Sequence, residues 1–418
     1  MKIQIVAFLL LITTSLHAQQ IEQAKALLKA NKLMEAKAVA DEIARDVNFV
    51  RKGDAWYTIA KIYGAIANDP VLSKQVPNAW DQSFTALKNY TEVDDKLLIA
   101  LQIDGYKPIN DIYTGYYQSA ACNFNAKEYA KALEGFKNAI DVSTFMANKG
   151  WIKLKLDTNS VLYAGVSAEK LSRNDEAAKY YGQLAEVKVR GEGFVEIYKW
   201  VTNYYFEQKN QAQADKFLAI GKEVYPGDPF WDSIELDIVR AKADPQALFA
   251  VYDRTIAANP TNHLYYYNYA VELYQYAYSI YPSKRPVNSE TMIDKVVTLL
   301  TKALAIKPDY QRAQLFAGQV HYNSGVDQLN KAKEITGTTP GDVKQKAELK
   351  AAALAKFDLA IPYLNEVDKL IGQKTTLTKD ERADLLEAYD LMLTIYEQKG
   401  ATDKVKEYET KFNTLAKK

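Results

Sequence analysis

Cysteine and histidine are scarce in this sequence. Among 418 residues the chain has one cysteine, Cys122, and three histidines. A single cysteine cannot form an intramolecular disulfide, and metal sites that need paired cysteines are excluded. We expect Cys122 to be a small buried apolar residue on a helix.

An excess of charge of one sign is also absent. Lys and Arg number 53 and Asp and Glu number 52, which gives a formal net charge of +1. A nucleic-acid binder usually needs a basic face that displaces counterions from phosphates. Because no block rich in Lys and Arg stands out, we expect no nucleic-acid partner.

The common catalytic and cofactor motifs are missing. The chain has no GxxxxGK[ST] phosphate loop, no GxSxG elbow and no two histidines four residues apart. Gly191-Glu192-Gly193 is too short for a dinucleotide fingerprint. The sequence therefore predicts a protein that is not an enzyme, with no catalytic residues, no cofactor and no metal.

Only the N-terminus carries a long apolar run. Lys2 precedes residues 3–12, which are apolar except for Gln4, and smaller residues follow as far as Ala18. This order is typical of a secretory signal, with cleavage expected near Ala18. No other stretch approaches the roughly 18 apolar residues of a membrane span. We expect a periplasmic or secreted mature chain with no membrane span, and the absence of disulfides with many Lys, Asn, Gln and Tyr residues favours a bacterial periplasm.

Small and aromatic residues recur at helical spacing along the chain. The pattern is seen in Tyr116, Ala120, Tyr129, Ala132, Phe136 and Ala139. Similar sets follow, and prolines stand where second helices would end. They include Gly165, Ala168, Ala177, Tyr181 and Leu184; Tyr198, Tyr205, Ala214, Leu218, Gly221 and Pro226; and Val296, Leu300, Ala303 and Pro308.

This pattern resembles the tetratricopeptide repeat, in which two antiparallel helices form a unit of about 34 residues. The resemblance implies an all-α fold, an α-solenoid of stacked antiparallel helix pairs with a right-handed superhelical path. We expect about eight or nine pairs. The predicted organisation is a signal peptide (1–18), N-terminal helix pairs (19–110), a central array (111–280) and C-terminal pairs with long insertions (281–418).

Several connections are predicted to be longer than usual for such repeats. Gly, Pro and Asp residues indicate loops at Ala65 to Asn78, Asp95 to Asn110, Ile280 to Thr291 and Gly325 to Gln345. The segment from Trp151 to Val161 is interpreted as an extended connection that runs into a helix.

Tyrosine is unusually abundant, with 30 residues. Its ring and hydroxyl suit it to interfaces. The resemblance implies that first-helix side chains line a concave face, where some family members grip a peptide carboxylate with Lys and Asn. Lys199 and Asn203 resemble those positions, but Ile234 stands where the next unit of the clamp has Asn. We therefore expect a generic peptide groove, with candidates Tyr117, Phe124, Lys199, Asn203, Phe206, Tyr267 and Tyr274.

Two functions are compatible with these observations. The first is a non-catalytic scaffold or adaptor in the bacterial periplasm that binds peptides or proteins on its helical surface. The alternative is an outer-surface nutrient-binding protein with tetratricopeptide-like helices, in which aromatic side chains stack on oligosaccharides.

Overall fold

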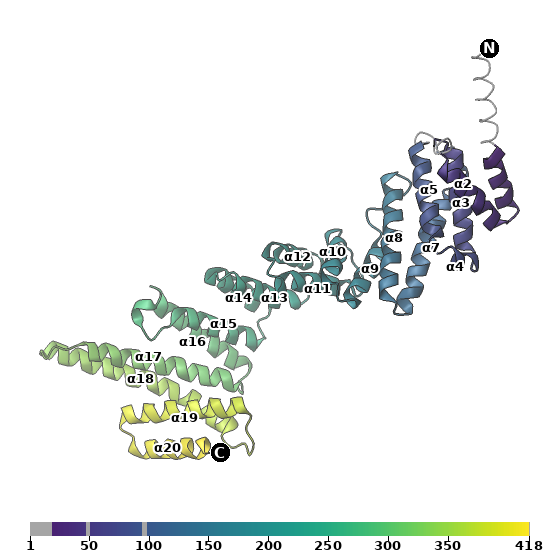
Figure 1. Cartoon of the computed structure of the whole chain (residues 1–418). Coiled ribbons are helices and arrows are strands. Elements are labelled where there is room, and N and C mark those ends of the chain that lie inside the picture. The colour runs from purple at the N-terminus through teal and green to yellow at the C-terminus, as the bar shows by residue number, and fades with distance from the viewer. Residues whose placement is uncertain (1–18, 47–50, 94–97, 418) are drawn as a thin grey trace, which may run out of the picture. The chain divides into compact units, whose positions relative to one another are not determined.

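The described part of the chain is helical. The computed structural model describes residues 19–46, 51–93 and 98–417, and over these residues it contains helices and turns and no strand (Figure 1). The all-α prediction is therefore confirmed. The predicted signal peptide, residues 1–18, lies outside the described residues.

The chain divides into two compact units. The N-terminal unit extends to Trp231, and the C-terminal unit is Asp232–Lys418. The division falls inside helix α13 (Phe230–Ala241). The three repeat segments expected from the sequence are a different kind of division, and they stay a prediction.

In the N-terminal unit, helices that follow each other in the chain pack as antiparallel pairs. The short helix α4 (Leu72–Gln75) lies in the connection between α3 and α5, and α6 (Ile99–Ile103) lies between the second and third pairs. The pairs are residues 19–29 with α2 (Leu33–Arg45), α3 (Gly53–Asn68) with α5 (Ala79–Val93), α7 (Lys107–Asn125) with α8 (Tyr129–Asn148), α9 (Thr158–Lys170) with α10 (Asn174–Glu186), and α11 (Phe194–Glu207) with α12 (Gln211–Val224).

The C-terminal unit continues the same arrangement. After α13, α14 (Pro245–Ala258) leads to three further pairs. These are α15 (His263–Ala277) with α16 (Ser289–Ile306), α17 (Gln311–Glu334) with α18 (Pro340–Ile371), and α19 (Lys379–Lys399) with α20 (Thr402–Ala416). A 3-10 helix, Pro282–Lys284, lies between α15 and α16.

One turn joins the helices of most pairs. A single residue in the left-handed region ends the first helix, and the next N–H donates to a carbonyl five residues back, as from Asn210 to Tyr205 at 2.9 Å. This is the Schellman ending of a helix. Lys209 and Ala243, both with a left-handed φ, lie 34 residues apart, the length of the predicted repeat. The residues with both features are Asn31, Lys127, Ser172, Lys209 and Gly400, and Ala243 shares their positive φ.

The paired helices approach closely where one of them carries a small residue. Gly165 on α9 faces Tyr181 on α10, and a Cβ atom added to Gly165 would lie 2.6 Å from Cε1 of that ring. Gly325 on α17 faces Phe357 on α18 in the same way, at 2.5 Å. Tight packing of this kind is why small residues recur in the sequence at the pair contacts.

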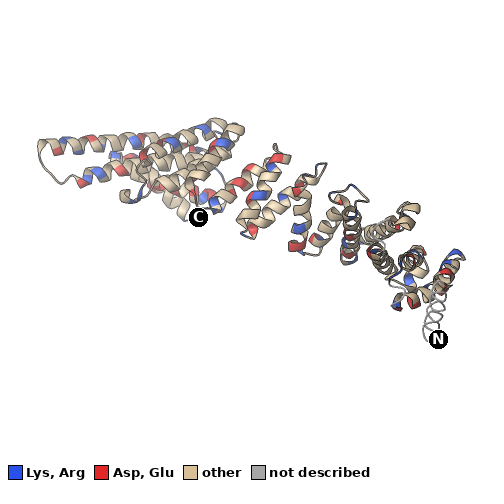
Figure 2. Ribbon diagram, turned by 90° about the horizontal axis from the view of Figure 1, so that it is seen from above, with Lys and Arg blue, Asp and Glu red and all other residues tan. Residues whose placement is uncertain are grey.

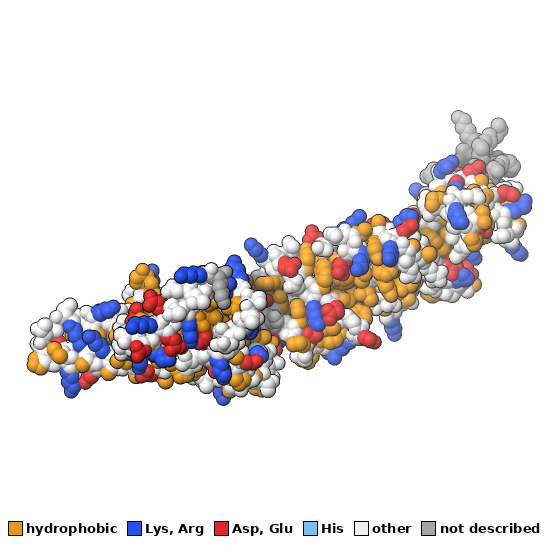
Figure 3. Space-filling view, turned by 90° about the horizontal axis from the view of Figure 1, so that it is seen from below, with side chains coloured by type: hydrophobic (Ala, Val, Ile, Leu, Met, Phe, Trp, Pro, Cys, Tyr) orange, Lys and Arg blue, Asp and Glu red, His pale blue; other side chains and the backbone are white. Residues whose placement is uncertain are grey.

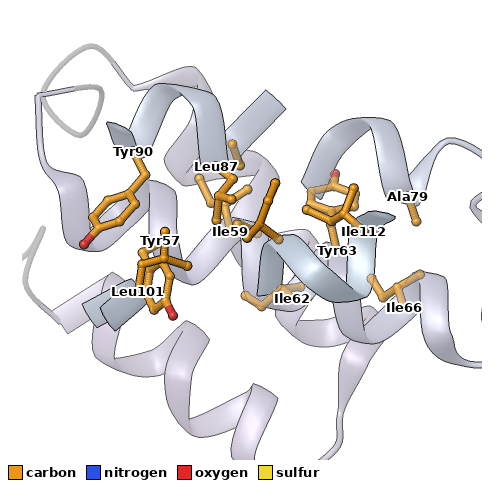
Figure 4. Close-up of a cluster of buried hydrophobic side chains, with 14 of the residues drawn as sticks. Tyr57, Ile59, Ile62, Tyr63, Ile66, Ala79, Leu87, Tyr90, Leu101 and Ile112 are labelled. Atoms are coloured by element: carbon orange, nitrogen blue, oxygen red, sulfur yellow. The ribbon is translucent and has the colours of Figure 1, made fainter. Parts of the chain in front are cut away.

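Apolar side chains from several pairs form the cores. In the first pairs of the N-terminal unit, side chains of α3, α5 and α7 such as Ile62, Leu87 and Ile112 are fully buried together (Figure 4). The repeat positions Ala120, Ala132 and Phe136 are also fully buried. Because each core draws on neighbouring pairs, the prediction that stacked pairs complete one another's cores is confirmed.

The predicted loop from Gly325 to Gln345 is wrong over most of its length. Helix α17 continues to Glu334 and α18 begins at Pro340, so only residues 335–339 are irregular. Proline is compatible with the first turn of a helix, where its missing N–H has no partner to lose. Thr339 and Asp342 also form a capping box that starts α18 at this point.

Two other predicted loops are shorter than expected, since α3 continues to Asn68 and α7 begins at Lys107. The extended connection predicted after Trp151 is confirmed, because residues 151–157 are irregular and α9 starts at Thr158.

The prediction of a buried Cys122 is wrong. Its thiol is free and the residue is exposed on α7. The buried face of this helix contains Ile109, Ile112, Tyr116 and Ala120, which are three or four residues apart. Cys122 lies off that stripe, so helical periodicity places it at the surface.

Charges of both signs are interspersed along the helices (Figure 2). Among the described helices, none combines the length and the apolar character needed to cross a membrane.

Candidate functional site

The predicted groove residues fall into separate groups. Tyr117 and Phe124, both half-buried on α7, contact the ring of Phe136 on α8 with centroid distances of 5.7 and 6.4 Å. Phe124 also meets Tyr163 of α9 at 5.2 Å. These two candidates therefore hold α7, α8 and α9 together.

Two further candidates belong to the C-terminal unit. Tyr267 and Tyr274 on α15 contact the ring of Phe316 on α17, at 6.2 and 5.4 Å. Asn323 donates a hydrogen bond to the Tyr274 hydroxyl at 2.9 Å, and Tyr278 stacks on the Tyr274 ring at 4.8 Å. Both tyrosines are engaged in packing between neighbouring first helices.

Lys199 and Asn203 line a groove of about 660 Å³ in the N-terminal unit, which we call the central groove. Its walls come from α9, α11 and the start of α13, with Tyr181 of α10, so first helices dominate it. Phe206, the remaining candidate, is half-buried on α11 and does not line it. The lining residues are Leu162, Val166, Glu169, Tyr181, Glu192, Gly193, Phe194, Glu196, Ile197, Lys199, Trp200, Asn203 and Phe230.

The central groove has an aromatic wall. The Trp200 ring meets Tyr181 edge-on at 5.1 Å and stacks on Tyr204 at 5.2 Å, with only 6° between the planes. Phe194 at the start of α11 and Phe230 at the start of α13 also line it and are half-buried. Partly exposed rings that are held by neighbouring rings offer apolar contact area at little cost in side-chain entropy.

Lys199 is neutralised by the protein itself. Its ammonium lies 2.7 Å from Asp228 and 3.0 Å from Glu196. The hydrogen bond to Asp228, followed by that to Glu196, raises the pKa of Lys199. Asn203 donates to Glu207 at 2.8 Å. Both groups that resemble a carboxylate clamp therefore already have acidic partners.

Asp228 is held in its charged form by the same contacts. Partial burial favours a higher pKa, but hydrogen bonds from Lys199 and from the backbone N–H of Phe230 outweigh it and lower the pKa of Asp228. The Phe230 N–H lies 2.9 Å from the carboxylate oxygen. The Lys199–Asp228 pair thus fixes the start of α13 against α11.

A second groove lies on the first-helix side of the initial pairs. It measures about 870 Å³ and is lined by residues 25–29, α3, α6 and the start of α7. Lysine–aspartate pairs cross its surface, Lys25 with Asp54 at 2.8 Å and Lys61 with Asp104 at 2.9 Å. Because these pairs satisfy each other and the groove lacks a cluster of rings, the central groove is the stronger candidate.

The described residues contain no group of three or more His, Cys, Asp or Glu side chains placed to hold a metal ion. His321, on α17, is buried and stacks on Tyr363 at 5.7 Å. His263 begins α15 and meets Tyr310 edge-on at 5.0 Å.

The sequence interpretation missed the aromatic wall. Phe194, Ile197 and Trp200 are spaced three residues apart on α11, so they share one face. The sequence signal for this stripe is the three-residue spacing of apolar residues on a first helix, whereas the clamp interpretation considered only Lys199 and Asn203.

Figure 3 shows that apolar side chains also gather between charged ones at the surface.

No protein-family model and no curated protein matches the chain. Solved structures do match it at low identity. A TPR repeats protein from Bacteroides fragilis is 18% identical, with 67% of this chain and 98% of that chain covered and a TM-score of 0.29.

Two other solved structures extend the comparison. The C-terminal part of a TPR repeat-containing protein from Cytophaga hutchinsonii is 12% identical, covers 94% of this chain and 95% of its own, and has a TM-score of 0.26. The TPR2AB domain of yeast Sti1, in a pHSP90 complex, is 11% identical. The match covers 67% of this chain and 99% of that chain, with a TM-score of 0.23. Scores this low carry no argument about function, and the assignment of stacked helix pairs stands on the chain's own geometry.

Proposed function

We propose that this protein is a non-catalytic scaffold that binds polypeptide segments in the central groove of its N-terminal unit. The observation that carries the proposal is the half-buried aromatic wall around Trp200, which first helices hold open beside a groove of about 660 Å³. A volume of this size accommodates several side chains of an incoming segment.

The aromatic wall accounts for affinity in this proposal. Trp and Tyr are enriched among residues that dominate binding energy, because their large rings lose water on contact and lose few rotamers. Trp200 is held by Tyr181 and Tyr204, so its ring is positioned before a partner arrives. Preorganisation of this kind reduces the entropic cost of association.

A selection from a displayed random-peptide library tests the proposal. Peptides that the full-length protein enriches are measured by titration calorimetry against the parent and against Trp200→Ala. We expect the substitution to weaken binding by more than about tenfold. Tyr281→Ala is the matched control, since Tyr281 is an exposed aromatic residue of the C-terminal unit. The control variant should bind like the parent.

Two results would overturn the proposal. One is the absence of any enriched peptide, and the other is a Trp200→Ala variant that melts like the parent and binds equally well. A glycan array probed in parallel addresses the alternative function. Oligosaccharide binding that Trp200→Ala abolishes, without peptide binding, would replace the scaffold with the nutrient-binding protein.

We also propose that the chain is exported and acts in the periplasm or outside the cell. The charged start, the apolar run of residues 3–12 and the small residues before Gln19 support this proposal. Mass spectrometry of the protein from its own cells should find an N-terminus near Gln19. Recovery of the intact Met1 end from the cytoplasm would contradict it.

A further inference from the structure

The charges around the central groove are unequal. Its lining contains three glutamates, Glu169, Glu192 and Glu196, and a single cation, Lys199. The whole chain is nearly neutral, with a formal charge of +1, so this local excess of negative charge is a property of the groove.

The one cation does not offset the glutamates. Lys199 lies 2.7 Å from Asp228, which is outside the groove lining, and shares its remaining hydrogen-bonding capacity with Glu196. Its side chain is only 22% exposed. The positive charge therefore faces a carboxylate of the protein, and a ligand entering the groove meets the carboxylates of the rim.

The three glutamates are placed to act on a ligand. Glu192 is exposed in the turn before α11, and in the part of the chain that the structure describes no ion pair or hydrogen bond engages its side chain. The Glu196 side chain is 70% exposed. Glu169 accepts a hydrogen bond from Tyr181 at 2.6 Å, and burial together with this bond raises the pKa of that phenol, which stays protonated at neutral pH.

Between these carboxylates the groove is apolar. Leu162 and Val166 of α9 line it together with Ile197 and Trp200 of α11. A partner that fits both features has apolar side chains for the floor and cations beside them for the rim. Opposite charges across an interface raise the rate of encounter and discriminate against like-charged partners.

We propose that the central groove selects polypeptide segments in which apolar residues are flanked by Lys or Arg. This inference rests on the proposed function and specifies its ligand class. It is the reverse of a carboxylate clamp, because the groove contributes the acidic groups and the ligand contributes the basic ones.

Three fluorescent peptides test the proposal. They share a central apolar sequence of Leu, Phe and Ile, and they carry two Lys, two Ser or two Glu residues on each side. At low ionic strength we expect the Lys-flanked peptide to bind the full-length protein about tenfold or more tighter than the Glu-flanked peptide. The difference should shrink strongly when salt is raised to about 1 M, where the screening length falls to about 3 Å.

Charge reversal supplies the decisive comparison. In the double variant Glu192→Lys, Glu196→Lys the preference should invert, so that the Glu-flanked peptide binds more tightly. Glu290→Lys in the C-terminal unit is the matched control, since Glu290 is 91% exposed and lies outside the groove. We expect it to keep the preference of the parent. Far-ultraviolet circular dichroism and a thermal melt verify that the variants are folded.

The outcomes separate this inference from the function on which it rests. If all three peptides bind equally and Trp200→Ala abolishes binding, the groove binds peptides and the charge selection is overturned. Tighter binding of the Glu-flanked peptide to the parent also overturns it. If no peptide binds, the scaffold proposal itself fails. A preference that does not invert in the double variant assigns the selection to another surface.

Discussion

Lys199 has two acidic partners, Asp228 and Glu196, and this decides what its removal should do. In a carboxylate clamp the Lys199→Ala change abolishes binding. In the groove described above it releases Asp228 and Glu196 from their partner and makes the site more negative. We expect the Lys-flanked peptide to bind a few-fold tighter to Lys199→Ala, as removal of one partly exposed charge changes binding by about 0.5–1 kcal/mol.

Fluorescence titration at low salt measures this effect. Lys344→Ala, a loss of the same charge at an exposed position of α18, is the control and should leave affinity unchanged. Loss of binding in Lys199→Ala alone would favour the clamp.

His321 makes the C-terminal unit sensitive to acid. Burial lowers the pKa of this imidazole below its usual value of 6.5, and the positive charge of Lys356 acts in the same direction. In the unfolded chain His321 therefore binds a proton near pH 6.5, whereas in the folded chain it binds this proton only at lower pH. The contribution to stability is intact above pH 6.5 and decreases as the pH falls below it, by at most about 1.4 kcal/mol per pH unit.

Denaturant unfolding at a series of pH values between about 7 and 5 checks this expectation. His321→Phe keeps a ring against Tyr363 but cannot titrate, so its stability should decrease less over the same range. Equal pH dependence in the two proteins would refute the role of His321.

At the scale of an element, the recurring left-handed turn stores strain. Ala243 joins α13 and α14 with φ of +53°, a region that a Cβ atom disfavours by about 1–2 kcal/mol. Ala243→Gly should raise the free energy of unfolding by about 0.5–1 kcal/mol, because glycine adopts this conformation without the clash.

Ala250→Gly is the matched control for the turn. Ala250 is exposed in the middle of α14, where glycine lowers helix stability by about 1 kcal/mol. Chemical denaturation of both variants should show changes of opposite sign. A decrease in both would show that the turn at residue 243 is not strained.

The helix pairs could be predicted from the sequence, but their exact limits could not. Tyr116, Ala120 and Phe136 signal packed helices because buried positions recur every three or four residues. The turns gave no such signal, since Lys127, Ser172 and Lys209 adopt a backbone conformation usually associated with glycine. There the closing hydrogen bonds, and not the residue type, determine the conformation.

The candidate site shows the same limit. Lys199 and Asn203 could be assigned to the groove because their spacing places them on one helix face. Their acidic partners could not be predicted, since Asp228 comes from the next helix connection and meets Lys199 only through the packing of α11 and α13. Local periodicity contains no information about that approach.

At the scale of the whole molecule, stability should be local. Helix pairs contact mainly their neighbours in the chain, so a defect in one region is not transmitted far. Phe357 of α18 is fully buried against Gly325 and Tyr322 of α17. Phe357→Ala should destabilise this region by about 3–5 kcal/mol.

Hydrogen exchange followed by mass spectrometry locates the effect. Exchange should rise in α17 to α20 and remain unchanged in α3 to α8, and Trp200-dependent peptide binding should persist. A uniform increase along the chain would mean that the two units unfold as one cooperative body. Leu359→Ala on the same helix is the control, because Leu359 is 50% exposed.

The turns at Lys209 and Ala243 have a consequence for how such a chain is built. Both residues have a left-handed φ, 56° and 53°, and each follows the first helix of a pair, so the 34 residues between them correspond to one repeat of the array. A copy inserted at Ala243 would begin and end in the conformation that the chain already adopts there. Lengthening the array by one such 34-residue repeat should therefore add surface for partners without changes to the turns between its helices.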